Sequence, residues 1–284
     1  MNPYRIYRDE WANALRLQAT ATEYTSFVAM PFRERFSYRS QEILCEVIAG
    51  AVEEANRLGG LPRRFSSPQR VDIPRGAVVI TEEIVLQILQ CHIFIGDLTF
   101  QNAGVVLETG VAMGMKPIHQ IVLITQGRLD ELSFDLRNNN VISYNPKDSV
   151  VKIADALIAA GSHFEQQVQH LLVAVTQRLG PEAIAALRWY GTVQKQNKHY
   201  SLHAGNRGPH FSGAEGLQRF DLATGELRNR DLLWTEWKVG AIPGGDAFGM
   251  HATELGWAVI ERMWPDLKQE DEGGVHNLAD RSDG

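Results

Sequence analysis

This 284-residue chain has few cysteines and no recognisable metal-binding motif. Cys45 and Cys91 are its only cysteines and stand far apart, which excludes a disulfide framework and a cysteine-rich zinc cluster. The nine histidines form no metal-ligand spacing such as His-Glu-x-x-His, so we assign no metal site. A chain without a disulfide framework suits a reducing compartment, and we expect it to be cytoplasmic.

The chain also lacks long apolar runs and an excess of positive charge. No stretch comes near the roughly 18 uninterrupted apolar residues of a membrane span, and charges interrupt residues 1–25, unlike a signal peptide. The 34 Asp and Glu outnumber the 28 Lys and Arg, which gives a net charge of −6 and argues against a protein that coats nucleic acid. We therefore expect a soluble protein with no membrane partner.

Two nucleotide-binding motifs are missing as well. There is no phosphate loop, and the turn after the first expected strand reads Met-Pro-Phe-Arg-Glu-Arg-Phe (30–36) in place of Gly-x-Gly-x-x-Gly. We therefore disfavour a dehydrogenase and expect no bound cofactor. Arg33 and Arg35 in this turn could contact a phosphate, although exposed loop arginines are more often only solvated.

The first half alternates short apolar runs with helical patterns. Strands are expected at 25–32, 64–66, 92–99, 121–125 and 141–144, and helices at 38–58, 81–90 and 104–115. This alternation predicts an α/β fold, a Rossmann-like (flavodoxin-like) parallel sheet with flanking helices, in a domain over residues 1–148. Ligands of such sheets bind beyond the carboxyl ends of the strands, where Pro31, Asp97 and Thr99 fall.

The second half is organised differently. Residues 149–180 are expected to form a helical connector, with a break at Gly161. Residues 181–268 then show a helix, a partly helical stretch over 222–237, two short strands around Gly244–Asp246 and a helix from about Thr253. That order predicts a smaller α+β winged-helix-like domain, and the acidic, polar residues 269–284 predict a disordered tail.

The densest chemical signal lies between Asp97 and Pro117. On a helix, Glu108 shares a face with small and apolar residues three and four positions away, namely Gly104, Val105, Val111 and Ala112. A carboxylate in such surroundings is buried or lines a cleft, and that placement usually goes with a partner or a task. The alternative is that Glu108 only complements the N-terminal end of the helix dipole.

Asp97 ends an expected strand and could bring a second carboxylate to the same place. Two carboxylates suit glycosidic chemistry, in which one supports an oxocarbenium-like centre and the other positions hydroxyls or helps the leaving group. The alternative, of equal weight, is that Asp97 caps the following turn, a common role at a strand end.

Several motifs of the first half resemble those of one group of Rossmann-type domains. They are FVAMPF at 27–32, Asp72 after an arginine-rich strand, ITEEIVLQILQC at 80–91 and HIFIGDLTFQNAGVVLETGVAMGMKP at 92–117. Together they resemble the nucleoside 2-deoxyribosyltransferase-like and TIR-like branch, in which a strand ending in Asp-Leu-Thr precedes an Asn and a helix with Glu-Leu-Gly-x-Ala. The resemblance covers about the first 145 residues.

The match to the group's pattern is incomplete in two places. In Glu108-Thr109-Gly110-Val111-Ala112 the threonine replaces a leucine, and residues 101–104 read Gln-Asn-Ala-Gly where the group more often has Asn-Pro-Asn-Val. Residues 134–137 match the group's Phe-Asp-Leu-Arg, with Ser133 in place of the preceding proline.

The resemblance implies an N-glycosidase or deoxyribosyltransferase-like enzyme that cleaves the base–sugar bond of a nucleoside, a nucleotide or NAD, each as a substrate and not a cofactor. It makes Glu108 the catalytic carboxylate and Asp97 a catalytic-site residue near the sugar. Many relatives are effectors of bacterial antiviral defence and are fused to or paired with a sensor. The expected substrate-binding residues are Phe32, Asp72 and Asn102, to which the sheet edge adds Pro31 and Thr99 and the next turn adds Arg35.

The C-terminal segment has no excess of basic residues. Residues 181–264 contain nine Lys or Arg and nine Asp or Glu, whereas DNA-binding modules usually carry a basic stripe. We therefore favour self-association or a protein partner over nucleic acid, for which Arg228, Arg230 and Lys238 are the candidate contacts. The alternative for the whole chain is a catalytically silent nucleotide sensor or a DNA-binding regulator. The sequence leaves the base, the sugar and the number of subunits open.

Overall fold

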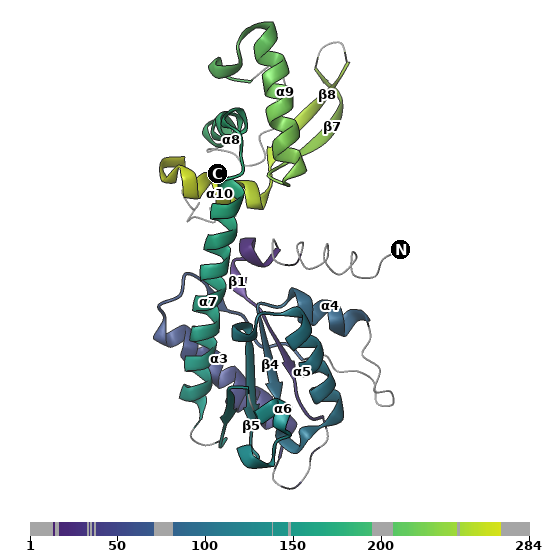
Figure 1. The fold of residues 1–284 in the computed structure, drawn as a ribbon, viewed down its shortest axis with the longest axis vertical. Coiled ribbons are helices and arrows are strands. Elements are labelled where there is room, and N and C mark those ends of the chain that lie inside the picture. The colour runs from purple at the N-terminus through teal and green to yellow at the C-terminus, as the bar shows by residue number, and fades with distance from the viewer. Residues whose placement is uncertain are drawn as a thin grey trace, which may run out of the picture. The chain divides into compact units, whose positions relative to one another are not determined.

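The computed structural model describes residues 14, 17–32, 34, 36, 38–70, 82–137, 139–146, 149–194, 207–242 and 245–267. The chain divides into two compact units, residues 1–170 and 171–284, and the boundary falls inside the long helix α7 (Val150–Thr176; Figure 1). The expected break at Gly161 is wrong, because α7 runs through it. Gly161 instead allows a close approach, since a Cβ there would lie 2.7 Å from Cδ1 of Leu61. Within the described residues, no helix is both long and apolar enough to cross a membrane.

Strands and helices alternate through the first unit. This confirms the expected mixed α/β architecture with a parallel sheet flanked by helices. Its strands are β1 (Glu23–Tyr24), β2 (Ser26–Ala29), β3 (Arg64–Phe65), β4 (Ile93–Asp97), β5 (Ile121–Thr125) and β6 (Val141–Ser143). Its helices are α2 (Ser40–Glu42), the π-helix η1 (Ile43–Ile48), α3 (Ala49–Leu58), α4 (Glu82–Gln90), α5 (Ala103–Met115) and α6 (Phe134–Arg137), with 3-10 turns η2 (Thr99–Gln101), η3 (Ile118–Gln120) and η4 (Leu129–Glu131).

The order of the strands creates a switch point next to β4. Strands β2, β4, β5 and β6 form one parallel sheet in that order, and β1 pairs in parallel with β3. Beyond β3, Gln69 bridges Phe27, and the N–H of Val28 donates to the Gln69 carbonyl at 2.8 Å. The segment 64–69 therefore lies on one side of β1 and β2, and β4 lies on the other. The winding direction reverses between β2 and β4, which is where ligands bind in open α/β sheets.

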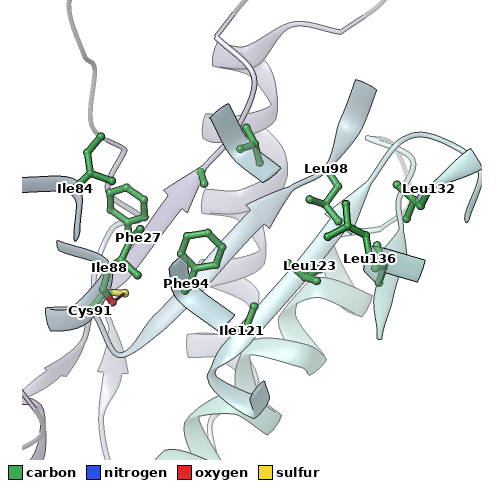
Figure 2. Close-up of a cluster of buried hydrophobic side chains, with 14 residues drawn as sticks. Phe27, Ile84, Ile88, Cys91, Phe94, Leu98, Ile121, Leu123, Leu132 and Leu136 are labelled. Carbon is green, nitrogen blue, oxygen red and sulfur yellow. Dashed lines mark hydrogen bonds between the residues drawn. The ribbon is translucent and has the colours of Figure 1, made fainter. Parts of the chain in front are cut away.

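Different helices cover the two faces of this sheet (Figure 1). On one face, Phe27 and Phe94 belong to a buried cluster with residues of α4, α5 and α6 (Figure 2), and their rings stack with centroids 6.0 Å apart. Gly96 is on this face, where a Cβ would lie 3.0 Å from the hydroxyl oxygen of Thr109 on α5. Helices α3 and α7 lie on the other face. Because side chains alternate along a strand, Asp97 points to that other face, away from α5.

The second unit has the expected element order of helix, helix, hairpin and helix. It contains α8 (Pro181–Gln194), α9 (Gly213–Asn229), the antiparallel strands β7 (Leu233–Ile242) and β8 (Gly245–Ala252), and α10 (Glu254–Met263), with 3-10 turns η5 (Pro209–Phe211) and η6 (Pro265–Leu267). Helix α9 begins earlier than expected and ends at Asn229, so the expected helical character of residues 233–237 is wrong: they belong to β7. Both hairpin strands are longer than expected. Thr253 caps α10 by accepting the N–H of Gly256 at 2.9 Å. The expected disordered tail at 269–284 lies outside the described residues.

Candidate active site

Glu108 lies in the second turn of α5, on the side that packs toward the sheet. Its neighbours along that side, Val105, Thr109 and Ala112, are all buried. Helix α5 begins just after the carboxyl end of β4, and helical side chains lean toward the N-terminus of their helix. The Glu108 carboxylate is therefore directed toward the carboxyl edge of the sheet.

The charge of Glu108 is not compensated by any residue that the structure describes. Its carboxylate has no hydrogen bond or ion pair among them, and desolvation by burial raises the pKa of Glu108 from 4.5 to about 7. Glu108 also lies beyond the first turn of α5, outside the range in which the helix dipole stabilises a carboxylate. A costly carboxylate of this kind is typical of a functional site.

The same burial predicts that Glu108 weakens the fold as the pH rises. Its folded-state pKa lies above the unfolded value, so folding favours the protonated form and stability is lost between about pH 4.5 and 7. Glu108→Gln removes this penalty. We compare the free energy of unfolding of the variant with that of wild type at each pH. The difference, variant minus wild type, should be about 1 to 2 kcal/mol larger at pH 8 than at pH 5. Urea unfolding at the two pH values measures it.

The matched control for this experiment is Glu83→Gln, which changes an exposed glutamate on α4 in the same way. Because Glu83 is exposed, its replacement removes no buried charge, and its variant provides the baseline for the comparison. A Glu108→Gln variant that follows wild type at both pH values would show that the carboxylate is not destabilised by burial.

Asp97 is held by four hydrogen bonds inside the first unit. The hydroxyls of Tyr38 and Tyr144 donate to its Oδ2 at 2.9 and 2.7 Å, while the N–H of Thr99, at 3.0 Å, and the Thr99 hydroxyl donate to Oδ1. The Asp97 side chain has no exposed surface. Burial raises the pKa of Asp97, and the hydrogen bonds act in the opposite direction. Asp97 thus ties together the segments before α2, after β4 and after β6.

The structure gives the two carboxylates of the sequence analysis different surroundings. Asp97 leaves β4 on the face opposite α5, and its acceptor positions are occupied, whereas Glu108 belongs to α5. The sequence left open that Asp97 caps the turn after β4. Its two hydrogen bonds with Thr99 are contacts of that kind. A direct catalytic role for Asp97 stays a prediction, and its contacts are those of a positioning residue.

Thr99 and Asn102 shape the backbone between β4 and α5. The buried Thr99 hydroxyl accepts the N–H of Gln126 at 2.9 Å, and the Asn102 side chain accepts the N–H groups of Gly104 and Val105 at 3.0 and 3.4 Å. Asn102 is thus the N-cap of α5 and fixes the start of the helix that carries Glu108.

The other expected pocket residues are only partly described. Pro31 is buried, and Phe32 is 48% exposed with the guanidinium of Arg70 lying 5.0 Å from its ring centroid. Arg35 and Asp72 lie outside the described residues.

Sequence reasoning missed two exposed phenylalanines in left-handed backbone conformations. Phe100 has φ of 63° and is 42% exposed, and Phe36 has φ of 52°. Their ring centroids lie 6.1 Å apart, and Phe100 also contacts Tyr38 edge-on. Left-handed φ is rare and costly for bulky side chains and tends to occur at functional sites. The signal in the sequence was the aromatic residue directly after Asp-Leu-Thr.

The candidate nucleic-acid contacts in the second unit differ in their surroundings. Arg228 is exposed, whereas Arg230 pairs with Glu226 at 3.2 Å and donates to the carbonyl of Arg178 at 2.8 Å. The side chain of Lys238 lies outside the described part. Among the described residues of the chain, no group of three or more His, Cys, Asp or Glu side chains could hold a metal ion.

Comparisons with known proteins add no relative. No protein-family model matches the chain, and neither the curated proteins nor the solved structures contain a significant match.

Proposed function

We propose that the first unit is an N-glycosidase or deoxyribosyltransferase-like enzyme that cleaves the base–sugar bond of a nucleoside, a nucleotide or NAD. The observation that carries the proposal is the Glu108 carboxylate, partly buried and uncompensated by described residues, on the helix that starts at the carboxyl end of β4. Its position in the Glu-Thr-Gly-Val-Ala element matches the catalytic carboxylate of the group that the sequence resembles.

The strand order supports a Rossmann-like, flavodoxin-like assignment for this unit. Segment 64–69, then β1 with β2, then β4, β5 and β6 correspond to the doubly wound order 2-1-3-4-5. The switch point of that order lies between β2 and β4. The turn from β4 into α5 begins there, so a substrate at the switch point would lie next to the helix that carries Glu108.

This reaction requires Glu108 in its ionised form. The carboxylate attacks the anomeric carbon while the carbon–nitrogen bond breaks, and the base leaves with the bonding electrons. The base of a nucleoside or nucleotide then takes a proton from solvent, whereas nicotinamide leaves NAD as a neutral molecule and needs none. Water, or a second base, then displaces Glu108 from the sugar and gives up a proton to solvent. A carboxylate poorly solvated in the free enzyme is a stronger nucleophile and stabilises an adjacent oxocarbenium-like centre more effectively.

The neighbouring residues have supporting roles in this proposal. Phe32 and Phe100 offer exposed aromatic surface against which a base could stack. Asp97 is a positioning residue. It accepts a hydrogen bond from Tyr38, and the Tyr38 ring contacts Phe100, so Asp97 helps to hold Phe100 in place at the edge of the sheet.

The test is a base-release assay with the full-length protein. We expect incubation with NAD and a panel of nucleosides and mononucleotides to yield a free base, detected by chromatography, for at least one substrate. Because Glu108 has to be ionised, kcat/KM should rise with pH to a plateau, with an apparent pKa near 7. Ligand binding without any base release would contradict the proposal.

That contrary outcome would favour a catalytically silent nucleotide sensor. The observation that favours a sensor is that Asp97 is buried and fully hydrogen-bonded, which leaves Glu108 as the only carboxylate of the expected pair without a described partner. Glycosidic cleavage that requires two carboxylates at the sugar would not be supported by such a site.

We further propose that the second unit is winged-helix-like and controls the first unit or recruits a partner. Its element order of helix, helix, hairpin and helix supports this proposal.

A further inference from the structure

The second unit contains a cavity that is separate from Glu108 and its surroundings. It has a volume of about 460 Å³ and lies between α8, the turn η5 and the end of α10. This volume falls in the range of small-molecule sites. The residues that line it include Arg188, Trp189, Arg207, His210 and Trp264, and none of the described lining residues is acidic.

The aromatic walls of the cavity are held in place by their neighbours. Gly208 has φ of +78°, and its backbone lies against the indole of Trp189 so closely that a Cβ would be 2.6 Å from that ring. On the other side, the guanidinium carbon of Arg188 lies 5.9 Å from the ring centroid of Trp264. Two indoles and a planar guanidinium provide flat surfaces for a planar ligand.

The charge of the cavity favours an anion. Arg188 is exposed and has no ion pair with any described residue. The nearby carboxylate of Glu182 is occupied, because its two oxygens accept from His210 and Arg219, each at 2.9 Å. Arg207 directs donors to the carbonyls of Phe211 and Gly213 and so holds the η5 turn. A guanidinium without an ion pair, placed beside flat aromatic walls, can bind a phosphate while the walls hold the planar ring of the same ligand.

We propose that this cavity binds a nucleotide, a nucleobase joined through its sugar to a phosphate, with the base on the indoles and the phosphate on Arg188. The site is distinct from the proposed active site, and its ligand is bound and not cleaved. A free mononucleotide and the end of a single-stranded nucleic acid both present this chemistry. The second unit would then respond to a nucleotide of its own, whichever reaction the first unit performs.

The test is tryptophan emission of the full-length protein titrated with AMP, adenosine, inorganic phosphate and a short single-stranded oligonucleotide. Five of the six tryptophans, at positions 189, 234, 237, 257 and 264, belong to the second unit, so emission reports mainly on it. We expect AMP to quench the emission in a saturable way and adenosine to bind at least tenfold more weakly. An oligonucleotide that binds more tightly than AMP identifies a nucleic-acid end as the ligand, and the reverse identifies a free mononucleotide.

Variants locate the binding. Arg188→Gln should weaken AMP binding at least tenfold, and Trp264→Phe should reduce the amplitude of quenching. The matched control Arg178→Gln removes an exposed arginine of the same unit that does not line the cavity, and it should bind as wild type. All titrations are repeated in the Glu108→Gln background, where AMP is not consumed. The proposal is overturned if AMP does not quench, if adenosine binds as tightly as AMP, or if Arg188→Gln and Arg178→Gln behave alike while both remain folded.

Discussion

Glu108→Gln should reduce base release by at least about 10³-fold and leave substrate binding within a few-fold of wild type. Glutamine keeps the shape of the side chain but cannot attack the anomeric carbon or supply a negative charge beside the oxocarbenium-like centre. The loss should therefore appear in kcat and not in KM. The measurement is steady-state base release by chromatography, with substrate affinity determined separately by calorimetry.

Two controls make this result specific to the carboxylate. Glu83→Gln makes the same chemical change at an exposed position of α4 and should keep wild-type turnover. The Glu108→Gln protein should also unfold cooperatively, at least as stably as wild type at pH 8, because it no longer buries a charge. Wild-type turnover in this variant would end the assignment of Glu108, whichever substrate is cleaved.

Asp97→Ala should be the most destabilising of the substitutions considered, at about 3 to 5 kcal/mol. It leaves the hydroxyls of Tyr38 and Tyr144 without their acceptor in the protein interior, and it also removes both contacts of Thr99. The cost exceeds that of a typical hydrogen bond because several buried groups lose their partner together. Urea unfolding at neutral pH, with the denaturant slope compared between variants, measures the effect.

Single deletions at the partners of Asp97 provide the comparison. Tyr38→Phe and Tyr144→Phe each remove one donor and leave the carboxylate with three hydrogen bonds, so each should cost about 1 to 3 kcal/mol. If Asp97→Ala costs no more than either tyrosine variant, the carboxylate does not hold the three segments together. If the Asp97→Ala variant is folded, its base-release activity reports whether the edge of the sheet also positions the substrate.

The sequence by itself determined the local elements of the first unit and the character of Glu108. Strand β5 occupies the residues that its apolar run predicted, and α5 begins within one residue of its expected start. These predictions depend on periodicity along the chain, which burial of one face imposes on any helix or strand. The face of Glu108 follows from the same spacing, because Gly104, Val105, Val111 and Ala112 lie three and four positions away.

Only the tertiary structure decided what surrounds Asp97 and which residues form the cavity of the second unit. The hydroxyls that bind Asp97 come from residues 59 and 47 positions away, and no local pattern connects them to it. Likewise, Arg188 on α8 meets Trp264 only because α10 packs beside α8 after a hairpin has intervened. Spacing along the chain sets which face a side chain occupies, whereas its partners depend on the path of the whole chain, since burial joins segments that the sequence separates.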